Sequence, residues 1–141
     1  MTEILDFVQR HLMLVVAFAA VLALVVFTEF QRLTQSFKDL APHEVVKAMN
    51  SDSPLLLDVR ESRELGGGMI NGARHLPLSD LGKRLQELEK DKDRPVIVYC
   101  RSGSRSATAC RMLQKKGFTD VAHLSGGIMA WQSANLPLTR K

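Results

Sequence analysis

Cysteine is scarce in this sequence. Cys100 and Cys110 are the only two among 141 residues, which excludes a disulfide scaffold and a zinc site made of cysteines alone. The four histidines show neither an HExxH nor a CxxC companion spacing, so we expect no metal and no other cofactor. Two isolated thiols fit a reducing compartment best, and there a cysteine can serve as a reactive group.

The sequence also lacks the pattern of a nucleic acid-binding protein. Aromatic residues make up 6% of the chain, and none interleaves with the adjacent basic residues Lys115 and Lys116. We therefore expect no nucleic acid partner. Internal repeats and low-complexity tracts are absent as well, so the length suits one ordinary domain of about 100 to 150 residues with a short extension.

The apolar residues are concentrated near the start of the chain. All sixteen residues from Leu12 to Phe27 are apolar, and at a rise of ~1.5 Å per residue they would cover roughly 24 Å as a helix. Because this length is less than the hydrocarbon core of about 30 Å, flanking residues must also lie within the membrane. A cleaved secretory signal is the alternative, but this leader is acidic and its small residues lie inside the apolar run. We expect a short tail over residues 1–11 and a retained transmembrane helix over residues 12–28.

Basic residues beside the apolar run indicate the orientation of the chain. Arg10 stands alone before the run, whereas Arg32, Lys38 and Lys47 follow it. Because basic flanks tend to remain cytoplasmic, this difference predicts a single-pass protein of the cell inner (plasma) membrane with its C-terminal domain in the cytoplasm. Such a tether suggests a membrane protein as one partner.

A helical stripe follows the apolar run. Phe27, Phe30, Leu33 and Phe37 recur at steps of three or four residues among polar neighbours. This spacing predicts an amphipathic linker over residues 29–41 that continues the helix along the membrane interface. Packing of the stripe against a protein core is the alternative.

From residue 42 to residue 141, short apolar runs alternate with helical patterns. Strong strands are expected at 55–57 and 96–99, because these runs are apolar on both faces. A weaker strand is expected at 73–76 and a further strand at 121–124, and helices are expected at 42–49, 79–88, 104–116 and 127–134. The alternation predicts an α/β domain over residues 42–141 with a central parallel sheet flanked by helices.

The loop after the strand at 96–99 carries the chemistry. It reads Cys100-Arg101-Ser102-Gly103-Ser104-Arg105-Ser106, and ligands of parallel sheets bind beyond the carboxyl ends of the strands. Glycine lets successive N–H groups curl around one point, and the helix that follows adds its positive N-terminal end. A thiol at that point should have a lowered pKa and act as a nucleophile. A buried structural cysteine before an ordinary turn is the alternative.

Four segments resemble the rhodanese family. C-R-S-G-S-R-S after a strand resembles the family's active-site loop and is the most specific match. The other three are Leu57-Asp58-Val59-Arg60, Gly68-Met69-Ile70-Asn71-Gly72-Ala73, and Leu124-Ser125-Gly126-Gly127 with Trp131. They cover roughly residues 42 to 138, and with the N-terminal anchor the layout is similar to that of membrane-anchored bacterial rhodanese-like proteins. The resemblance implies a single rhodanese-like domain.

The resemblance also implies a sulfurtransferase. Cys100 would be the catalytic residue that takes a sulfane sulfur, as a persulfide, from a small sulfur-containing anion such as thiosulfate. It would then pass the sulfur to a thiol or protein acceptor. The implied substrate-binding cradle consists of Arg101, Ser102, Gly103, Ser104 and Arg105.

Some residues near this loop have other expected roles. Asp58 and Arg60 are interpreted as a structural pair. Met69 and Asn71 stand where the family usually has His and Pro, a departure that concerns the rigidity of their loop and not the chemistry. His75 and His123 are interpreted as ordinary strand-end residues, because an ionised thiol needs no separate base. Cys110 is expected to pack against the sheet, with a resolving thiol as the alternative.

Two other functions fit the same loop. Cysteine-dependent phosphatases and arsenate reductases share its geometry, but the phosphatases place one residue more between Cys and Arg than the four found here. The tighter ring favours a sulfur atom over a phosphoryl group. A membrane-tethered docking module that keeps the fold without catalysis is the other alternative, and the intact nucleophile loop argues against it.

Overall fold

The computed structural model describes residues 1–34 and 36–140. The chain divides into two compact units, residues 1–36 and residues 37–141. The first unit contains α1 (Thr2–Arg10) and α2 (Leu12–Leu33). The stretch predicted as a short tail, 1–11, is thus largely helical. Within α2, Leu12–Gln31 is long and apolar enough to cross a membrane by length and composition, and none of it is buried.

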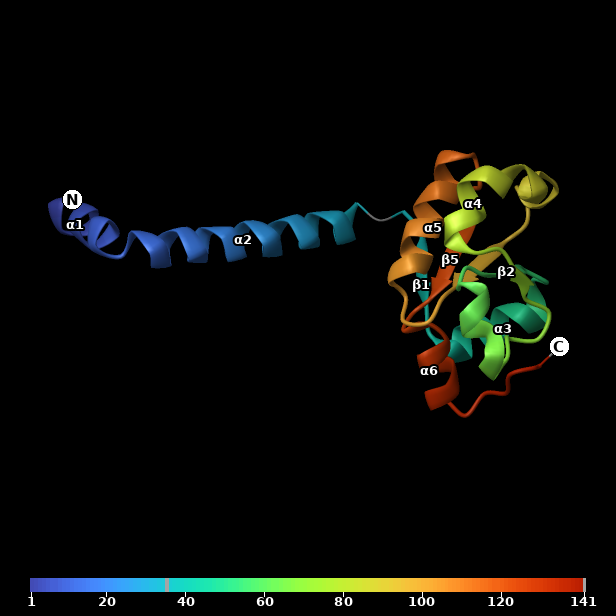
Figure 1. Ribbon diagram of the computed structural model, residues 1–141. Helices are drawn as coiled ribbons and strands as arrows, with labels where there is room; N and C mark the ends of the chain where they lie inside the picture. Colours follow the sequence, from blue (N-terminus) through green and yellow to red (C-terminus); the bar gives the residue numbers. More distant parts are fainter. Residues whose placement is uncertain (35, 141) are drawn as a thin grey trace. The chain divides into compact units, whose positions relative to one another are not determined.

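A parallel sheet forms the centre of the second unit (Figure 1). Its strands are β1 (Lys38–Leu40), β2 (Leu55–Asp58), β3 (Arg74–His75), β4 (Val96–Tyr99) and β5 (Val121–Leu124). They lie in the order β1-β5-β4-β2-β3, and every neighbouring pair is parallel. Every residue of β2, β4 and β5 is buried, because helices cover both faces. The predicted α/β fold with a central parallel sheet is confirmed.

Two helices pack on each face of this sheet. One face carries α4 (Leu78–Arg84) and α5 (Ser104–Lys115), and the other carries α3 (Pro42–Ser51) and α6 (Gly127–Ser133). Side chains along each strand alternate between the two faces: Leu57 and Val98 lie on the α5 face, whereas Leu56 and Ile97 lie on the α6 face. Two 3₁₀ helices, η1 (Ser62–Gly67) and η2 (Leu85–Asp91), complete the unit. The helix predicted over 79–88 is therefore α4 followed by η2, and η1 was not predicted.

Strand β1 lies inside the range predicted as an amphipathic linker, 29–41. It pairs with β5 at the edge of the sheet, and Phe37 just before it is 5% exposed in the core. For Phe37 the core-packing alternative is therefore the right one. The linker prediction was wrong here because β1 has only three residues, two of them charged and exposed, and so no apolar run marks it.

This placement of β1 predicts where the second unit begins. A fragment of residues 36–141 should fold by itself, whereas a fragment of residues 41–141 loses β1 and the buried Phe37 ring. Loss of a buried Phe side chain costs about 3 kcal/mol or more, which lowers the melting temperature of a domain this size by at least about 10 °C. Near-ultraviolet circular dichroism during heating measures the difference. Equal melting of the two fragments would place the boundary after β1.

Candidate active site

Cys100 lies directly after β4, at the carboxyl end of the sheet, and is fully buried. The loop that follows turns its amide groups toward the thiol. The N–H of Gly103 donates to Cys100 Sγ at 3.1 Å, and the N–H of Ser106 donates at 3.4 Å. Gly103 has φ 110° and ψ −15° at the N-terminus of α5, a left-handed conformation that favours glycine. The structure thus brings the loop residues around the sulfur.

Two opposing effects set the pKa of the Cys100 thiol. Burial is the larger single effect and by itself raises the pKa. Hydrogen bonds to the sulfur from the Ser106 hydroxyl and from the N–H groups of Ser106, Gly103 and Ser102 together outweigh burial, and they hold the pKa below its ordinary value. Ser106 Oγ lies 3.6 Å from Sγ. The loop therefore favours the thiolate, the nucleophilic form.

Cys110 has the opposite surroundings. It is fully buried in α5 against β5, and its Sγ lies 3.6 Å from the carbonyl oxygen of Ala122. Burial raises the pKa of its thiol far above the ordinary value. Its place in the apolar cluster between α5 and the sheet agrees with the expected packing role.

Arg105 points to a carboxylate. Its two terminal nitrogens donate to the two carboxylate oxygens of Glu64, each at 2.6 Å. This hydrogen bonding holds the pKa of Glu64 down at about 2. The pair joins η1 to the active-site loop and neutralises the guanidinium that the sequence assigned to substrate binding. Arg105 can bind an anion directly only if this pair opens.

Asp58 and Arg60 form the structural pair expected from the sequence. Both are buried, and Arg60 donates to both oxygens of Asp58 at distances between 2.7 and 3.0 Å. Arg60 also donates to the carbonyl oxygens of Gly68 at 2.8 Å and Glu64 at 3.2 Å. All of these bonds fix η1 and the segment after it beside the site.

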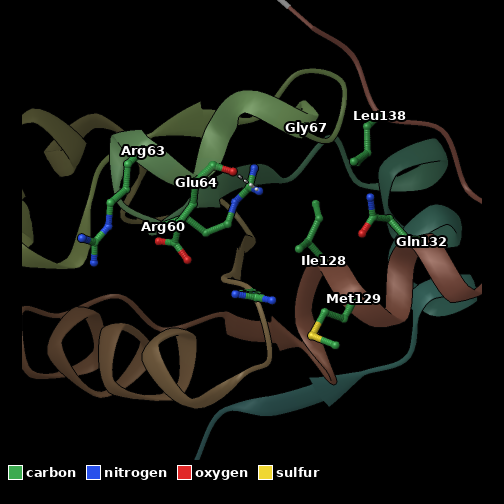
Figure 2. Close-up of a pocket in the computed structure, with 9 residues that line it drawn as sticks. Arg60, Arg63, Glu64, Gly67, Ile128, Met129, Gln132 and Leu138 are labelled. Carbon is green, nitrogen blue, oxygen red and sulfur yellow. Dashed lines mark hydrogen bonds between the residues drawn. The ribbon is translucent and has the colours of Figure 1, made fainter.

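A cavity of about 630 Å³ adjoins the loop (Figure 2). Arg60, Glu64 and Gly67 lie on one side of it, and Ile128, Met129 and Gln132 of α6 lie on the other. Arg63 and Arg101 also line it, and both are exposed. Among the residues that the structure describes, neither of these two arginines forms a salt bridge with a carboxylate. The cavity therefore offers free positive charge beside apolar surface.

Gly127 of the L-x-G-G segment has a physical role beside the active-site loop. Gly127 has φ 62°, and a Cβ there would lie 2.5 Å from the carbonyl oxygens of Cys100 and Arg101. This close approach lets the N–H of Ile128 donate to Cys100 O at 2.8 Å, and the N–H of Met129 donate to Arg101 O at 3.2 Å. The start of α6 thereby fixes the backbone of the active-site loop.

Sequence reasoning missed four polar groups around the thiol. Glu64 holds Arg105, and Ser106 contacts the sulfur. Ser106 Oγ also lies 2.9 Å from Nδ1 of His123, whose Nε2 is hydrogen-bonded to Asp39. Ser106 was visible as the last residue of the loop motif. No signal in the sequence could show that η1 or β1 would bring Glu64 and Asp39 to this place.

Metal ligands do not gather in the described part of the chain. Residues 1–34 and 36–140 contain no group of three His, Cys, Asp or Glu side chains that could hold a metal ion.

Comparison with known proteins identifies the same domain. The family model for the rhodanese-like domain matches residues 41–134. The Escherichia coli (strain K12) protein YibN is 36% identical over 141 residues, 99% of each chain. A protein of Allochromatium vinosum named "Sulfurtransferase" is 42% identical over 89 residues, 63% of this chain and 81% of its own. The crystal structure of a rhodanese-related protein from Thermoplasma volcanium superposes with a TM-score of 0.67 at 28% identity, over 74% of this chain and all of that one.

Proposed function

Because this chain belongs to the rhodanese-like domain family, we propose that it is a sulfurtransferase in which Cys100 carries the sulfur as a persulfide. The observation that carries the proposal is the position of the Cys100 sulfur, which receives N–H groups from Gly103 and Ser106 at 3.1 and 3.4 Å. The relative of Allochromatium vinosum that bears the name "Sulfurtransferase" supports the same class of reaction.

Transfer takes two steps. In the first, the Cys100 thiolate attacks the outer sulfur of thiosulfate, the sulfur–sulfur bond breaks, and sulfite leaves with the electron pair. In the second, a thiolate or another thiophilic acceptor attacks the terminal sulfur of the persulfide and releases the Cys100 thiolate. The amide groups around Sγ stabilise negative charge on the outer sulfur as they do on the thiolate. Because Cys100 is fully buried, the loop must open toward the cavity for each attack.

The arginines divide the remaining work. Arg101 and Arg63 face the cavity and attract the anionic donor, whereas Arg105 is held by Glu64 and positions the loop. The loop has one residue fewer between Cys100 and Arg105 than the cysteine-dependent phosphatases have, and this tighter ring argues against the phosphatase and arsenate reductase alternatives.

This division predicts different results for two arginine variants. Arg101→Ala should lower kcat/KM for thiosulfate by roughly ten- to a hundredfold, because one charge-assisted contact is worth ~1.5 to 3 kcal/mol. Arg105→Ala and Glu64→Gln should impair transfer by the same factor as each other, because each breaks the same ion pair. The double variant should therefore be no worse than either single variant. Sulfite release at several thiosulfate concentrations measures these effects. An Arg105→Ala variant far worse than Glu64→Gln would mean that Arg105 binds the anion directly.

The apolar helix α2 is the feature that bears on where the protein is located. We propose that Leu12–Gln31 of α2 anchors the chain in the cell inner membrane as a single pass, with the catalytic domain in the cytoplasm. The acceptor is then a small thiol or a protein, and a membrane protein would be within reach of the tether. The full chain should stay in the membrane pellet after alkaline carbonate washing, whereas residues 36–141 should be recovered in the supernatant. Release of the full chain by the wash would rule out the anchor.

Turnover by the purified protein tests the proposed function. Thiosulfate and cyanide should yield thiocyanate and sulfite in equal amounts, and an aryl phosphate should not be hydrolysed. The variant Cys110→Ala should keep the activity, since the Cys110 thiol lies against the carbonyl oxygen of Ala122 on β5. Phosphate release without sulfur transfer would replace this proposal with the phosphatase alternative.

A further inference from the structure

We infer that Ser106, His123 and Asp39 form a hydrogen-bonded chain that takes the proton of the Cys100 thiol, with His123 and Asp39 as positioning residues for the nucleophile. This inference deepens the proposed function and rests on Cys100 being its nucleophile. It assigns a role to a histidine that the sequence presents as an ordinary strand residue.

The geometry forms an unbroken path away from the sulfur. Cys100 Sγ lies 3.6 Å from Ser106 Oγ, and Ser106 Oγ lies 2.9 Å from Nδ1 of His123. On its other side the His123 ring is hydrogen-bonded through Nε2 to Oδ1 of Asp39. Ser106 is fully buried and His123 is 8% exposed, so water does not compete freely along the path. The path is most exposed to solvent at Asp39, whose side chain is 56% exposed.

The fold brings these residues together from three elements. Asp39 and His123 are direct partners in the parallel pairing of β1 with β5, although they are 84 residues apart in the chain. Ser106 lies in the first turn of α5, which begins at Ser104. Because neighbouring residues of paired strands point to the same face, the imidazole has a carboxylate beside it and the Ser106 hydroxyl near its other nitrogen.

The carboxylate determines which nitrogen of His123 accepts a proton. Asp39 accepts a hydrogen bond from Nε2–H, which leaves the lone pair of Nδ1 for the Ser106 hydroxyl. When the thiol ionises, the S–H bond breaks and its proton passes to Ser106 Oγ, while the hydroxyl proton passes to Nδ1. A neutral thiol and a neutral imidazole become a thiolate and an imidazolium, and Asp39 balances the new positive charge.

The same transfer improves the hydrogen bonding of the thiolate. Ser106 Oγ also lies 2.9 Å from the carbonyl oxygen of Gly103, which is a second acceptor for its hydroxyl. Once Nδ1 carries a proton, it donates to Ser106 Oγ, and the hydroxyl is free to donate to the thiolate. The chain thus ionises the thiol and then stabilises the product.

Few other charged or titratable groups face His123. Besides Asp39 on β1, the described surroundings include Cys100 after β4 and Cys110 and Arg111 on α5, and the pKa of Cys110 senses both Asp39 and Arg111. The ring of Phe37 packs edge-on against His123 at 5.3 Å between centroids, and the Arg111 guanidinium lies 5.9 Å from the Phe37 ring. Asp39 is the charged group hydrogen-bonded to the imidazole.

The test measures the ionisation of Cys100 itself. The absorbance of the thiolate in the far ultraviolet is titrated against pH in the full chain in detergent, in a Cys110→Ala background, with Cys100→Ser as the blank. Tyr99 is the only tyrosine, and burial raises its pKa far above the range of the titration, so it adds no signal. The readout requires no reagent to enter the buried site.

We expect His123→Gln to raise the pKa of Cys100 by about one unit, which means about tenfold less thiolate at any pH below both values. Ser106→Ala should raise it at least as much, and adding His123→Gln to Ser106→Ala should cause no further rise. Asp39→Asn keeps an acceptor oxygen but loses the charge, so its rise should be smaller and in the same direction. His75→Gln is the matched control and should leave the titration unchanged, because the His75 ring bonds to the Arg60 carbonyl oxygen.

Two results would overturn the inference. One is an unchanged Cys100 titration in a folded His123→Gln variant; if that variant fails to fold, an unchanged titration in Asp39→Asn decides in the same way. The other is a double variant, Ser106→Ala with His123→Gln, in which the rise of the Cys100 pKa equals the sum of the rises in the two single variants. Failure of the proposed function is distinguishable, since sulfur transfer without the predicted shifts contradicts only this inference, whereas the shifts without sulfur transfer contradict only the proposed function.

Discussion

Cys100→Ser is expected to reduce sulfur transfer to the uncatalysed background. A serine hydroxyl stays protonated near neutral pH and cannot form a persulfide, so both steps of the proposed reaction disappear together. The substitution changes one buried atom, and the hydrogen-bond donors of Gly103 and Ser106 have an oxygen to donate to in place of the sulfur. Stability should therefore change little. Thiocyanate formation and thermal unfolding, measured on the same preparation, separate the two effects.

The matched control for this variant is Cys110→Ala. Cys110 is as deeply buried as Cys100, but its thiol contacts α5 and β5 and not the loop. Residual transfer by Cys100→Ser, or an equal loss in Cys110→Ala, would mean that the chain carries sulfur by another route, with Cys110 as the first residue to test.

Gly127→Ala is expected to have the second large effect. A Cβ at Gly127 would lie 2.5 Å from the Cys100 and Arg101 carbonyl oxygens, and the positive φ of 62° adds backbone strain. Overpacking costs ~1 to 3 kcal/mol and a left-handed alanine ~1 to 2 kcal/mol, so the free energy of unfolding should fall by roughly 2 to 5 kcal/mol. Relief of the clash must move the backbone around the thiol. Activity should therefore fall by more than the loss of folded protein explains.

Gly82→Ala provides the control for a glycine substitution. Gly82 lies within α4, where a Cβ would meet only Met112 Cε, at an ordinary 3.6 Å. Alanine inside a helix is favoured by up to about 1 kcal/mol over glycine, so this variant should be as active as the native chain and slightly more stable. Denaturant unfolding and thiosulfate turnover on both variants check the pair. A fully active Gly127→Ala would show that α6 does not fix the loop.

The core of the fold could be predicted because its signals are local. Runs such as 55–57 and 96–99 are apolar on both faces, a pattern typical of a strand that is covered on both sides. These runs form β2 and β4 in the structure. β1 escaped prediction because an edge strand of three residues, two of them charged, takes its place from pairing with β5 and not from its own composition. η1 was missed because residues 62–67 carry no periodic apolar pattern.

The site also has a part that could be predicted from a local motif and a part that could not. The position of the Cys100 thiol and the turn at Gly103 follow from one contiguous motif, and the structure places Cys100 directly after β4 and Gly103 at the start of α5. The partners of the motif come from distant segments. Glu64 reaches Arg105 across 41 positions of the chain, and Asp39 reaches His123 through a strand register. Such contacts depend on how elements pack, so the sequence alone could not show the Glu64 partner of Arg105 or the Asp39 partner of His123.

The mass of the intact protein after exposure to thiosulfate tests the central claim most directly. If Cys100 carries the sulfur, the chain should gain the mass of one sulfur atom, peptide mapping should place it on Cys100, and cyanide or a thiol should remove it. The Cys110→Ala variant should gain the same mass and Cys100→Ser should gain none. A native chain that turns over thiosulfate without this gain, or a gain that persists in Cys100→Ser, would contradict the account.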